Sequence, residues 1–243
     1  MRVAALFDVH GNLPALEAVL ADPRCADADV VVSGGDLVVG PYPAECLERL
    51  EALGDRVRFL RGNCDREAVE TPEDGELREA SSWSNARLGP ERASRVARWP
   101  LTAELRVGGL GRVLFCHATP TSDVRILTRI TPDDAAREAL ADVDADVVVC
   151  GHTHVQYDRR VGSLRLVNAG SVGMPYEGSG DARWALLDGD GLELLATPYD
   201  TEAALDVLER AGFPLFRQWL VGSLRGEVSA EEATASFESR RGA

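Results

Sequence analysis

An aspartate and a histidine lie two positions apart near the start of the chain, directly after a short apolar run. The run covers residues 3–7, and Asp8 and His10 follow it. A continuous apolar run of this kind predicts a strand that is buried on both faces of a sheet. In open α/β sheets, ligands bind at the carboxyl ends of the strands. Because carboxylate oxygens and imidazole nitrogens bind divalent metals, we expect a ligand site at this strand end.

Similar residues follow four further apolar runs. These are Gly35-Asp36 after residues 30–32, Gly62-Asn63-Cys64-Asp65 after 57–60, His117 after 112–116, and Gly151-His152-Thr153-His154 after 147–150. A single histidine in such a place is most often structural, but all four histidines of this chain follow predicted strands. Together with the two aspartates and Asn63 they make seven nitrogen and oxygen side chains. This set suits a pair of borderline divalent ions better than a thiolate-binding metal.

The order of the predicted elements indicates an α/β protein. Helices predicted over residues 14–20 and 43–53 separate the first three strands, and such alternation is typical of parallel strands with right-handed crossovers. Residues 67–99 have a helical tendency. A further helix should run to Leu140, with Thr131 as its cap and Pro132 at its first position.

The second half of the chain is predicted to hold more strands and the closing helices. Strands are expected at residues 101–107, 112–116, 147–150, 157–161, 164–168, 183–188 and 192–198, and helices at about 202–211, 215–224 and 230–240. Glycines separate the last four strands, which indicates an antiparallel continuation as a second sheet or half. No linker or repeat is visible, so we expect one domain over residues 1–243.

Composition excludes several classes of function. The formal net charge is −14, which argues against general binding to nucleic acid or to an anionic membrane. The chain has no lysine, which excludes a lysine nucleophile or Schiff base. Its five cysteines are scattered without a disulfide pattern, and no apolar run reaches membrane-spanning length. We expect a soluble, cytoplasmic protein.

Taken in order, the five motifs resemble those of the calcineurin-like metallophosphoesterases. The resemblance covers about residues 2–175, and residues 168–173 resemble the segment that follows the last motif in small bacterial and archaeal phosphodiesterases. It implies a four-layer α/β/β/α sandwich as the fold class. It also implies a single metallophosphoesterase domain, on which we expect the helices at about 202–240 to pack.

The resemblance also implies two divalent metal ions and their ligands. One ion would take Asp8, His10, Asp36 and His154, and the other would take Asp36, Asn63, His117 and His152. Asp36 would bridge them, with the ions about 3.5–4 Å apart, so that a bridging hydroxide could attack a phosphodiester. Manganese is favoured, with iron, zinc, nickel and cobalt as alternatives. The cations would also attract a small phosphoester substrate into an acidic protein.

Cys64 departs from the motif of many family members, which carry a histidine at this position. In the family, that histidine is thought to assist the leaving group. The resemblance implies Asp36, Asn63 and Cys64 as the catalytic residues here, and the role of Cys64 in place of histidine is open. A thiol is a weak hydrogen-bond donor, which predicts reduced activity on poor leaving groups. Cys64 could equally be a small packed residue. Cys116 and Cys150 are expected in the core.

An alternative function is a metal-binding scaffold or protein-interaction module on the same fold. The complete set of seven ligand residues disfavours it, whereas Cys64 supports it. Substrate-binding residues are not identified, and six side chains are minor candidates for the surroundings of the site: Asn12 (also a helix cap), Asp65, Arg61, Arg66, Arg125 and Tyr176. The apolar segment at residues 213–220 should pack on the core, cover the substrate cleft or form a contact in a homo-oligomer.

Overall fold

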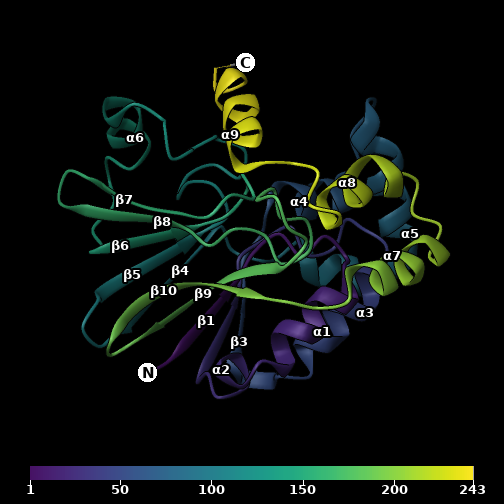
Figure 1. Cartoon of the computed structure of the whole chain (residues 1–243), viewed down its shortest axis with the longest axis horizontal. Helices are drawn as coiled ribbons and strands as arrows, with labels where there is room; N and C mark the ends of the chain where they lie inside the picture. The colour runs from purple at the N-terminus through teal and green to yellow at the C-terminus, as the bar shows by residue number, and fades with distance from the viewer. Residues whose placement is uncertain (243) are drawn as a thin grey trace.

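Two mixed sheets pack face to face in the computed structural model, which describes residues 1–242 (Figure 1). Ala243, the last residue of the expected domain, lies outside the described residues. The first sheet has the strand order β10-β9-β1-β2-β3 and the second has β4-β5-β6-β8-β7. The strands are β1 (Val3–Leu6), β2 (Val30–Ser33), β3 (Val57–Phe59), β4 (Thr102–Val107), β5 (Gly111–Cys116), β6 (Val147–Cys150), β7 (Tyr157–Val161), β8 (Leu164–Asn168), β9 (Ala182–Asp188) and β10 (Gly191–Thr197).

The predicted strands agree with the observed ones to within one residue at each end. β1, β2 and β3 pair in parallel, with Val3 opposite Val30 and Val31 opposite Val57, as the alternation of strands and helices predicted. Short runs bounded by Gly, Asp and Asn were sufficient to locate them. β1 and β2 are buried at every position and are apolar apart from Ser33 at the end of β2, whereas β3 lies at the sheet edge and carries the exposed Arg58.

The pairing of the later strands differs from the expected antiparallel half. β8 pairs with β6 in parallel, whereas β9 and β10 return to the first sheet, where β9 pairs antiparallel with β1. The predicted antiparallel pairing holds within the β7–β8 and β9–β10 hairpins. It was wrong for β8 against β6, and β9 and β10 belong to the first sheet and not to a second half. Glycine spacing locates turns, but the sheet that a strand joins depends on which sheet edge is left to pair with it.

Apolar side chains of both sheets divide into layers. Along β1, Ala4 and Leu6 pack against helices, whereas Val3 and Ala5 point toward the second sheet. A third cluster lies between the second sheet and the helix α6 (Asp133–Ala139). Figure 1 shows α6 beside the second sheet and the helices α1, α3 and α7 beside the first. The fold is thus the four-layer α/β/β/α sandwich, which confirms the predicted fold class.

The remaining helices are short, apart from a long one in the middle of the chain. They are α1 (Leu13–Ala21), α2 (Pro23–Ala26), α3 (Pro43–Glu51), η1 (Gly54–Arg56), α4 (Asn63–Val69), α5 (Glu76–Val96), α7 (Thr201–Arg210), the π-helical turn η2 (Arg217–Val221), α8 (Gly222–Leu224) and α9 (Ala230–Ser239). α5 is broken at Gly89, whose φ of 72° is not helical. In the described residues, we find no helix with the length and apolar character needed to cross a membrane.

Two details of the predicted helices were wrong. Pro132, not Thr131, is the cap of α6, because the Thr131 hydroxyl instead accepts a hydrogen bond from the Thr128 backbone amide and donates one to Glu238. The single helix expected at 215–224 is divided into η2 and α8. α7 contributes Leu205 and Leu208 to the core beside the first sheet.

Candidate metal centre

Six of the seven predicted ligand residues lie on loops that follow strands of the two facing sheets, and Asn63 is the first residue of the helix α4. Asp8, His10, Asp36 and Asn63 follow β1, β2 and β3 of the first sheet, and His117, His152 and His154 follow β5 and β6 of the second. Six of the seven are buried, and His152 is partly exposed. The structure brings them together between the carboxyl ends of these strands, where open α/β sheets bind ligands.

Five of these residues have a left-handed backbone. Their φ values lie between 46° and 66°, a region that residues other than glycine seldom adopt. They are Asp8, His10, Asp36, His152 and His154, and within the described chain they are the complete set of such non-glycine residues. Strained backbone of this kind clusters at functional sites, where it turns side chains toward one point.

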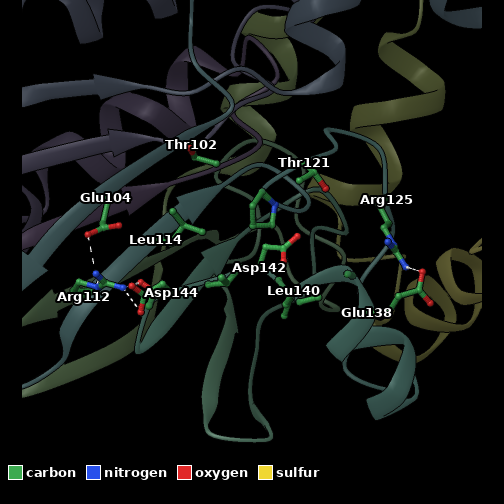
Figure 2. Close-up of a pocket in the computed structure, with 15 residues that line it drawn as sticks. Thr102, Glu104, Arg112, Leu114, Thr121, Arg125, Glu138, Leu140, Asp142 and Asp144 are labelled. Atoms are coloured by element: carbon green, nitrogen blue, oxygen red, sulfur yellow. Dashed lines mark hydrogen bonds and ion pairs between the residues drawn. The ribbon is translucent and has the colours of Figure 1, made fainter.

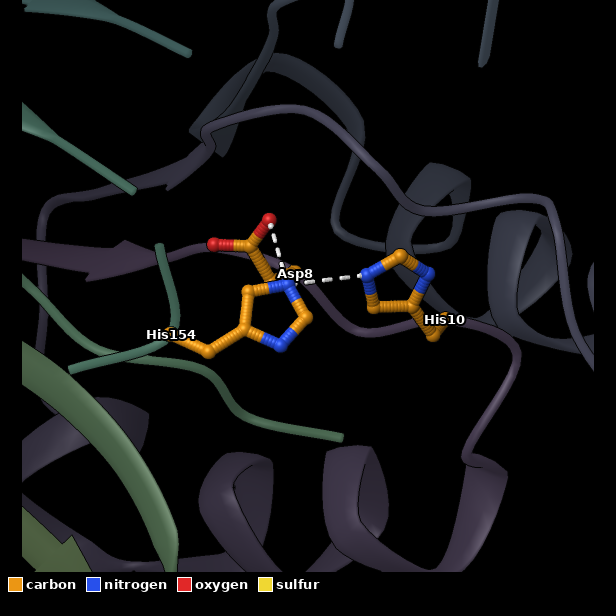
Figure 3. Close-up of side chains that lie close together, drawn as sticks. All are labelled: Asp8, His10 and His154. Carbon is orange, nitrogen blue, oxygen red and sulfur yellow. Dashed lines mark hydrogen bonds and ion pairs between the residues drawn. The ribbon is translucent and has the colours of Figure 1, made fainter. Parts of the chain in front are cut away.

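Asp8, His10 and His154 form the first group of side chains (Figure 3). The Nε2 atoms of the two histidines are 3.2 Å apart, and the His154 Nε2 lies 3.4 Å from Asp8 Oδ1. Ligand atoms of a tetrahedral site with metal–nitrogen bonds of about 2.0–2.1 Å are about 3.3 Å apart, so the observed spacing matches that of metal ligands.

The hydrogen bonds of the two imidazoles determine which nitrogens face each other. His10 Nδ1 lies 3.3 Å from the Val39 carbonyl and His154 Nδ1 lies 2.8 Å from the Met174 carbonyl. A carbonyl accepts hydrogen bonds and does not donate them, so each Nδ1 carries the hydrogen of a neutral ring and each Nε2 carries a lone pair. Two buried lone pairs at 3.2 Å repel each other unless a cation lies between them.

Asp8 provides a second unsatisfied acceptor at the same point. Its Oδ2 accepts a hydrogen bond from the His152 backbone amide at 2.9 Å, whereas the buried Oδ1 lacks a hydrogen-bond donor among the described residues. Buried polar atoms are normally satisfied. An unpaired carboxylate oxygen beside two imidazole lone pairs therefore fits a bound divalent cation.

Asp36, His117 and His152 form the second group. Asp36 Oδ2 is 3.5 Å from His117 Nε2 and 3.8 Å from His10 Nε2, so this carboxylate lies between the two groups. His117 Nδ1 lies 3.2 Å from the Gly34 carbonyl, which leaves Nε2 directed at Asp36 and at Asn63 Oδ1, 3.3 Å away. These groups again place acceptors against acceptors, an arrangement that a second cation would satisfy.

The electrostatics of the cluster favour cation binding at neutral pH. Burial and the neighbouring His154 lower the pKa of His10 to about 4, and burial and His117 lower the pKa of His152 to about 4. Burial opposes the ionisation of Asp8, but the imidazoles of His154 and His117 lower its pKa to about 2. Asp8 is therefore ionised and His10 and His152 are neutral at pH 7, the forms in which these groups bind metal. His117 differs, because the effect of burial is outweighed by the carboxylates of Asp36 and Asp8, which raise its pKa.

Asp65 holds the loop that carries Asp36. Its carboxylate accepts backbone hydrogen bonds from four amides, those of Gly62, Asp36, Leu37 and Val38, at 2.8–3.0 Å. Asp65 was a minor candidate in the sequence, and the structure shows it supporting the site through the backbone. Gly62 itself must lack a side chain, since a Cβ there would lie 2.1 Å from Asp36 Oδ1.

Asn168 and Ser171 support the site in ways that the sequence did not indicate. Asn168 donates to the Gly151 carbonyl at 2.6 Å and accepts from the Gly170 amide at 2.8 Å. The Ser171 hydroxyl donates to the Asp8 carbonyl at 2.7 Å. The resemblance of residues 168–173 to a known segment was the available signal, but it did not assign these contacts.

Cys64 lies beside the site as a protonated thiol. Its sulfur belongs to a group with His10 and Asp36, and its backbone amide donates to Asp36 Oδ1 at 2.8 Å. Burial and then the Asp36 carboxylate raise the pKa of the thiol well above its ordinary value. Cys116 and Cys150 lie in the core between the second sheet and α6, as predicted.

Aromatic rings from the second half of the chain cover the histidines. Tyr176 stacks on His154 with ring centroids 4.8 Å apart. Trp219 of η2 meets His10 edge to face at 5.8 Å, and Phe237 of α9 lies 6.1 Å from His152. Most of the apolar segment at 213–220 packs on the core, as predicted, while Trp219 covers the site. The sequence analysis missed Phe237, because local pattern does not reveal a contact across 85 residues.

The other minor candidates have mostly structural contacts. Asn12 caps α1 by accepting from the Ala15 amide at 3.1 Å, which confirms its predicted cap role. Arg66 pairs with Asp123 at 2.8 Å, and Arg125 pairs with Glu138 at 3.1 Å.

A cavity of about 410 Å³ lies elsewhere, over β4, β5 and α6 (Figure 2). Arg112 and Arg125 line it, but Arg112 pairs with Glu104 and Asp144 and Arg125 pairs with Glu138. Of the described residues that line this cavity, none is a predicted ligand. Two arginines face four carboxylates in its lining, so the cavity is acidic overall and does not suit a phosphoester anion.

Comparison with known proteins decides the family. A family model described as a calcineurin-like phosphoesterase superfamily domain matches residues 1–190. The chain belongs to this superfamily. An uncharacterised protein of Methanocaldococcus jannaschii is 27% identical to it, over 90% of this chain and 95% of that protein. Phosphodiesterase YfcE of Escherichia coli K12 is 26% identical, over 81% of this chain and 92% of the enzyme.

A solved structure agrees with the fold. The metallophosphoesterase from Sphaerobacter thermophilus superposes with a TM-score of 0.75 at 26% identity, over 94% of this calcineurin-like chain and 99% of the other. The superfamily is metal-dependent, and its relatives support a phosphoester hydrolase. The family match ends at residue 190, so α7, α8 and α9 lie beyond it.

Proposed function

We propose that this superfamily member is a dinuclear metal-dependent phosphodiesterase that hydrolyses a small phosphodiester. The observation that carries the proposal is the pair of Nε2 lone pairs of His10 and His154, buried 3.2 Å apart beside the unpaired Asp8 Oδ1. These three acceptor atoms repel one another in the absence of a cation, and a bound cation would be coordinated by all three.

The residues that would hold the two ions are those implied by the resemblance. Asp8, His10, Asp36 and His154 would hold one ion, and Asp36, Asn63, His117 and His152 would hold the other. A pair of divalent ions supplies water activation at neutral pH and neutralises charge on the phosphoryl oxygens. Carboxylate and amide oxygens beside imidazoles suit Mn²⁺, which we propose as the metal.

The other residues position these groups. The Asp65 carboxylate accepts a hydrogen bond from the Asp36 backbone amide and so holds the loop. The Cys64 backbone amide donates to Asp36 Oδ1 and so orients the Asp36 carboxylate. The protonated Cys64 thiol offers a weak hydrogen bond near the leaving group, which favours esters whose leaving group needs little protonation. Arg66 and Arg125 are paired with carboxylates, so they do not offer a free guanidinium to a second phosphate charge. The pairing of these two arginines favours a singly charged diester over a doubly charged monoester at the phosphate position.

Hydrolysis of bis-p-nitrophenyl phosphate and of p-nitrophenyl phosphate tests the proposal. Metal-stripped protein should be inactive, and added Mn²⁺ should restore cleavage, with a higher kcat/KM for the diester. His152→Ala should lower diester turnover by at least 100-fold, because one ion would lose a ligand.

Ser163→Ala, in the exposed turn between β7 and β8, is the matched control and should retain wild-type activity. Binding of Mn²⁺, Zn²⁺, Co²⁺ or Ni²⁺ without cleavage of either ester would contradict the proposal. That result would favour a scaffold or protein-interaction module.

A further inference from the structure

A cavity of about 420 Å³ lies among the closing helices, and its lining includes rings that contact the candidate metal centre. Tyr176, Trp219 and Phe237 line it, together with residues of α8 and α9. The same three rings contact His154, His10 and His152, respectively. A group attached to a phosphate at the metal centre would therefore lie within reach of this cavity. Its volume falls in the range of small-molecule sites.

The rings present partly exposed faces to the cavity. Tyr176, Trp219 and Phe237 are all half-buried, and Tyr176 and Phe237 lie 6.5 Å apart with their planes tilted by 34°. Aromatic faces that remain available at a cavity favour a planar ring, because offset stacking adds to the burial of apolar surface.

A cation lies at the edge of the same cavity. The guanidinium of Arg240 lies over the Phe237 ring, 4.6 Å from its centroid, and Nε donates to the Ser236 carbonyl at 3.2 Å. Within the described residues, Arg240 forms no ion pair with a carboxylate, although the chain carries a net charge of −14. Arginine stacks on aromatic faces, so it extends the planar surface and offers charge to an anionic ligand.

Hydrogen bonds to a distant loop place the α9 wall of this cavity. Glu238 Oε2 accepts hydrogen bonds from the hydroxyls of Thr128 and Thr131, at 2.7 and 2.8 Å. Arg129 pairs with Glu231 at 3.0 Å. The loop of Thr128 and Thr131 follows His117, so α9 is held against the same part of the chain that carries a metal-ligand candidate.

We propose that Tyr176, Trp219, Phe237 and Arg240 form a subsite for a planar aromatic or heteroaromatic group of the phosphodiester. The proposal rests on the proposed function for the position of the phosphate. Trp219 of η2, Phe237 of α9 and Arg240 at the end of α9 lie beyond the residues matched by the family model, whereas Tyr176 lies within them. The subsite would make the closing helices determine which diester this chain prefers.

Equilibrium binding tests the subsite without turnover. Two singly charged probes, methyl phenylphosphonate and methyl methylphosphonate, differ in the ring alone. Calorimetry on the Mn²⁺-loaded full chain should give a dissociation constant about tenfold lower for the phenyl probe. This preference is within the range that stacking on aromatic side chains contributes.

Substitutions then assign the preference to the cavity. Phe237→Ala should weaken binding of the phenyl probe by about tenfold and bring the ratio of the two constants toward one. Phe237→Leu retains apolar volume for helix packing and should lose the preference too, which covers the case in which the alanine variant does not fold. Ser239→Ala, on the exposed side of α9, should keep the wild-type ratio.

Two results would overturn the subsite. One is equal affinity of the wild-type protein for the two probes, and the other is the absence of measurable binding of the phenyl probe. Diester hydrolysis together with equal affinities would retain the proposed function and reject the subsite. A phenyl preference that Phe237→Leu removes, in a protein without turnover, would retain the subsite and reject the hydrolase.

Discussion

At the scale of single residues, the site concentrates backbone strain on its own ligand candidates. The five residues with φ between 46° and 66° are Asp8, His10, Asp36, His152 and His154, and each such conformation costs on the order of 1–3 kcal/mol. Hydrogen bonds between the strand-end loops oppose this cost. The Asp8 amide donates to the Gly35 carbonyl at 3.1 Å, and the His10 amide donates to the Asp36 carbonyl at 2.9 Å.

Asp65→Ala should lower the free energy of unfolding by about 3–5 kcal/mol, because it leaves four buried backbone amides without an acceptor. Urea denaturation of the metal-free protein measures the change. Asp27→Ala removes a carboxylate from an exposed position and should change stability by less than about 0.5 kcal/mol. If the Asp65 variant matched that control, the loop would be held by other contacts.

At the scale of elements, α9 is joined to the loop after His117 through Glu238. Two hydroxyl donors and Arg241 surround this carboxylate, and the ring of Phe237 on the same helix covers His152. Isolated ten-residue helices are marginal in water, so these tertiary contacts determine whether α9 stays in place.

Glu238→Ala should increase backbone hydrogen exchange of α9 by about 10-fold or more, because the two threonine hydroxyls lose their charged acceptor. Exchange followed by mass spectrometry measures the change. Glu231→Ala breaks an exposed ion pair with Arg129 and should have a much smaller effect. Equal exchange in the two variants would show that Glu238 does not hold the helix.

The contribution of Glu238 should also depend on pH. Burial opposes ionisation, but hydrogen bonds from Thr128 and Thr131 hold the pKa of Glu238 below its usual 4.5. Because the folded-state pKa is the lower one, the stabilisation is complete above about pH 5 and is lost as the pH falls through the folded-state pKa. Protection factors of α9 in the wild type and in Glu238→Gln should therefore differ at pH 7 and converge toward pH 3. A difference that persisted at pH 3 would contradict this assignment.

At the scale of the whole molecule, the candidate metal centre joins the two sheets. Asp8 and Asp36 follow strands of the first sheet, whereas His117 and His154 follow strands of the second. Bound cations would therefore link the two halves of the sandwich and remove the repulsion among buried acceptors.

Removal of metal should lower the Tm. A ligand at about 100 times its Kd contributes about 2.7 kcal/mol, which corresponds to about 5–10 °C for a chain of this size. Calorimetric scans with Mn²⁺ and with a chelator measure the shift, and His152→Ala should reduce it. An unchanged Tm, with metal binding shown separately, would mean that the ions do not link the sheets.

The sequence by itself determined the α/β class, all ten strands and the strand-end positions of the seven ligand candidates, and the resemblance of its five motifs implied the four-layer fold. It could do so because β1, β2 and β6, which are buried throughout, are apolar at nearly every position, because turn residues bound the other strands, and because metal chemistry requires particular residue types at strand ends. Asp8, Asp36 and the four histidines were recognisable from type and spacing alone.

Tertiary structure alone decided which sheet β8, β9 and β10 joined, which amides Asp65 accepts from, and that Phe237 of α9 covers His152. Turn residues and apolar periodicity report on neighbours within a few positions of the chain. Strand pairing and helix docking depend on contacts between residues that are distant in sequence, and these form when apolar surfaces are buried together.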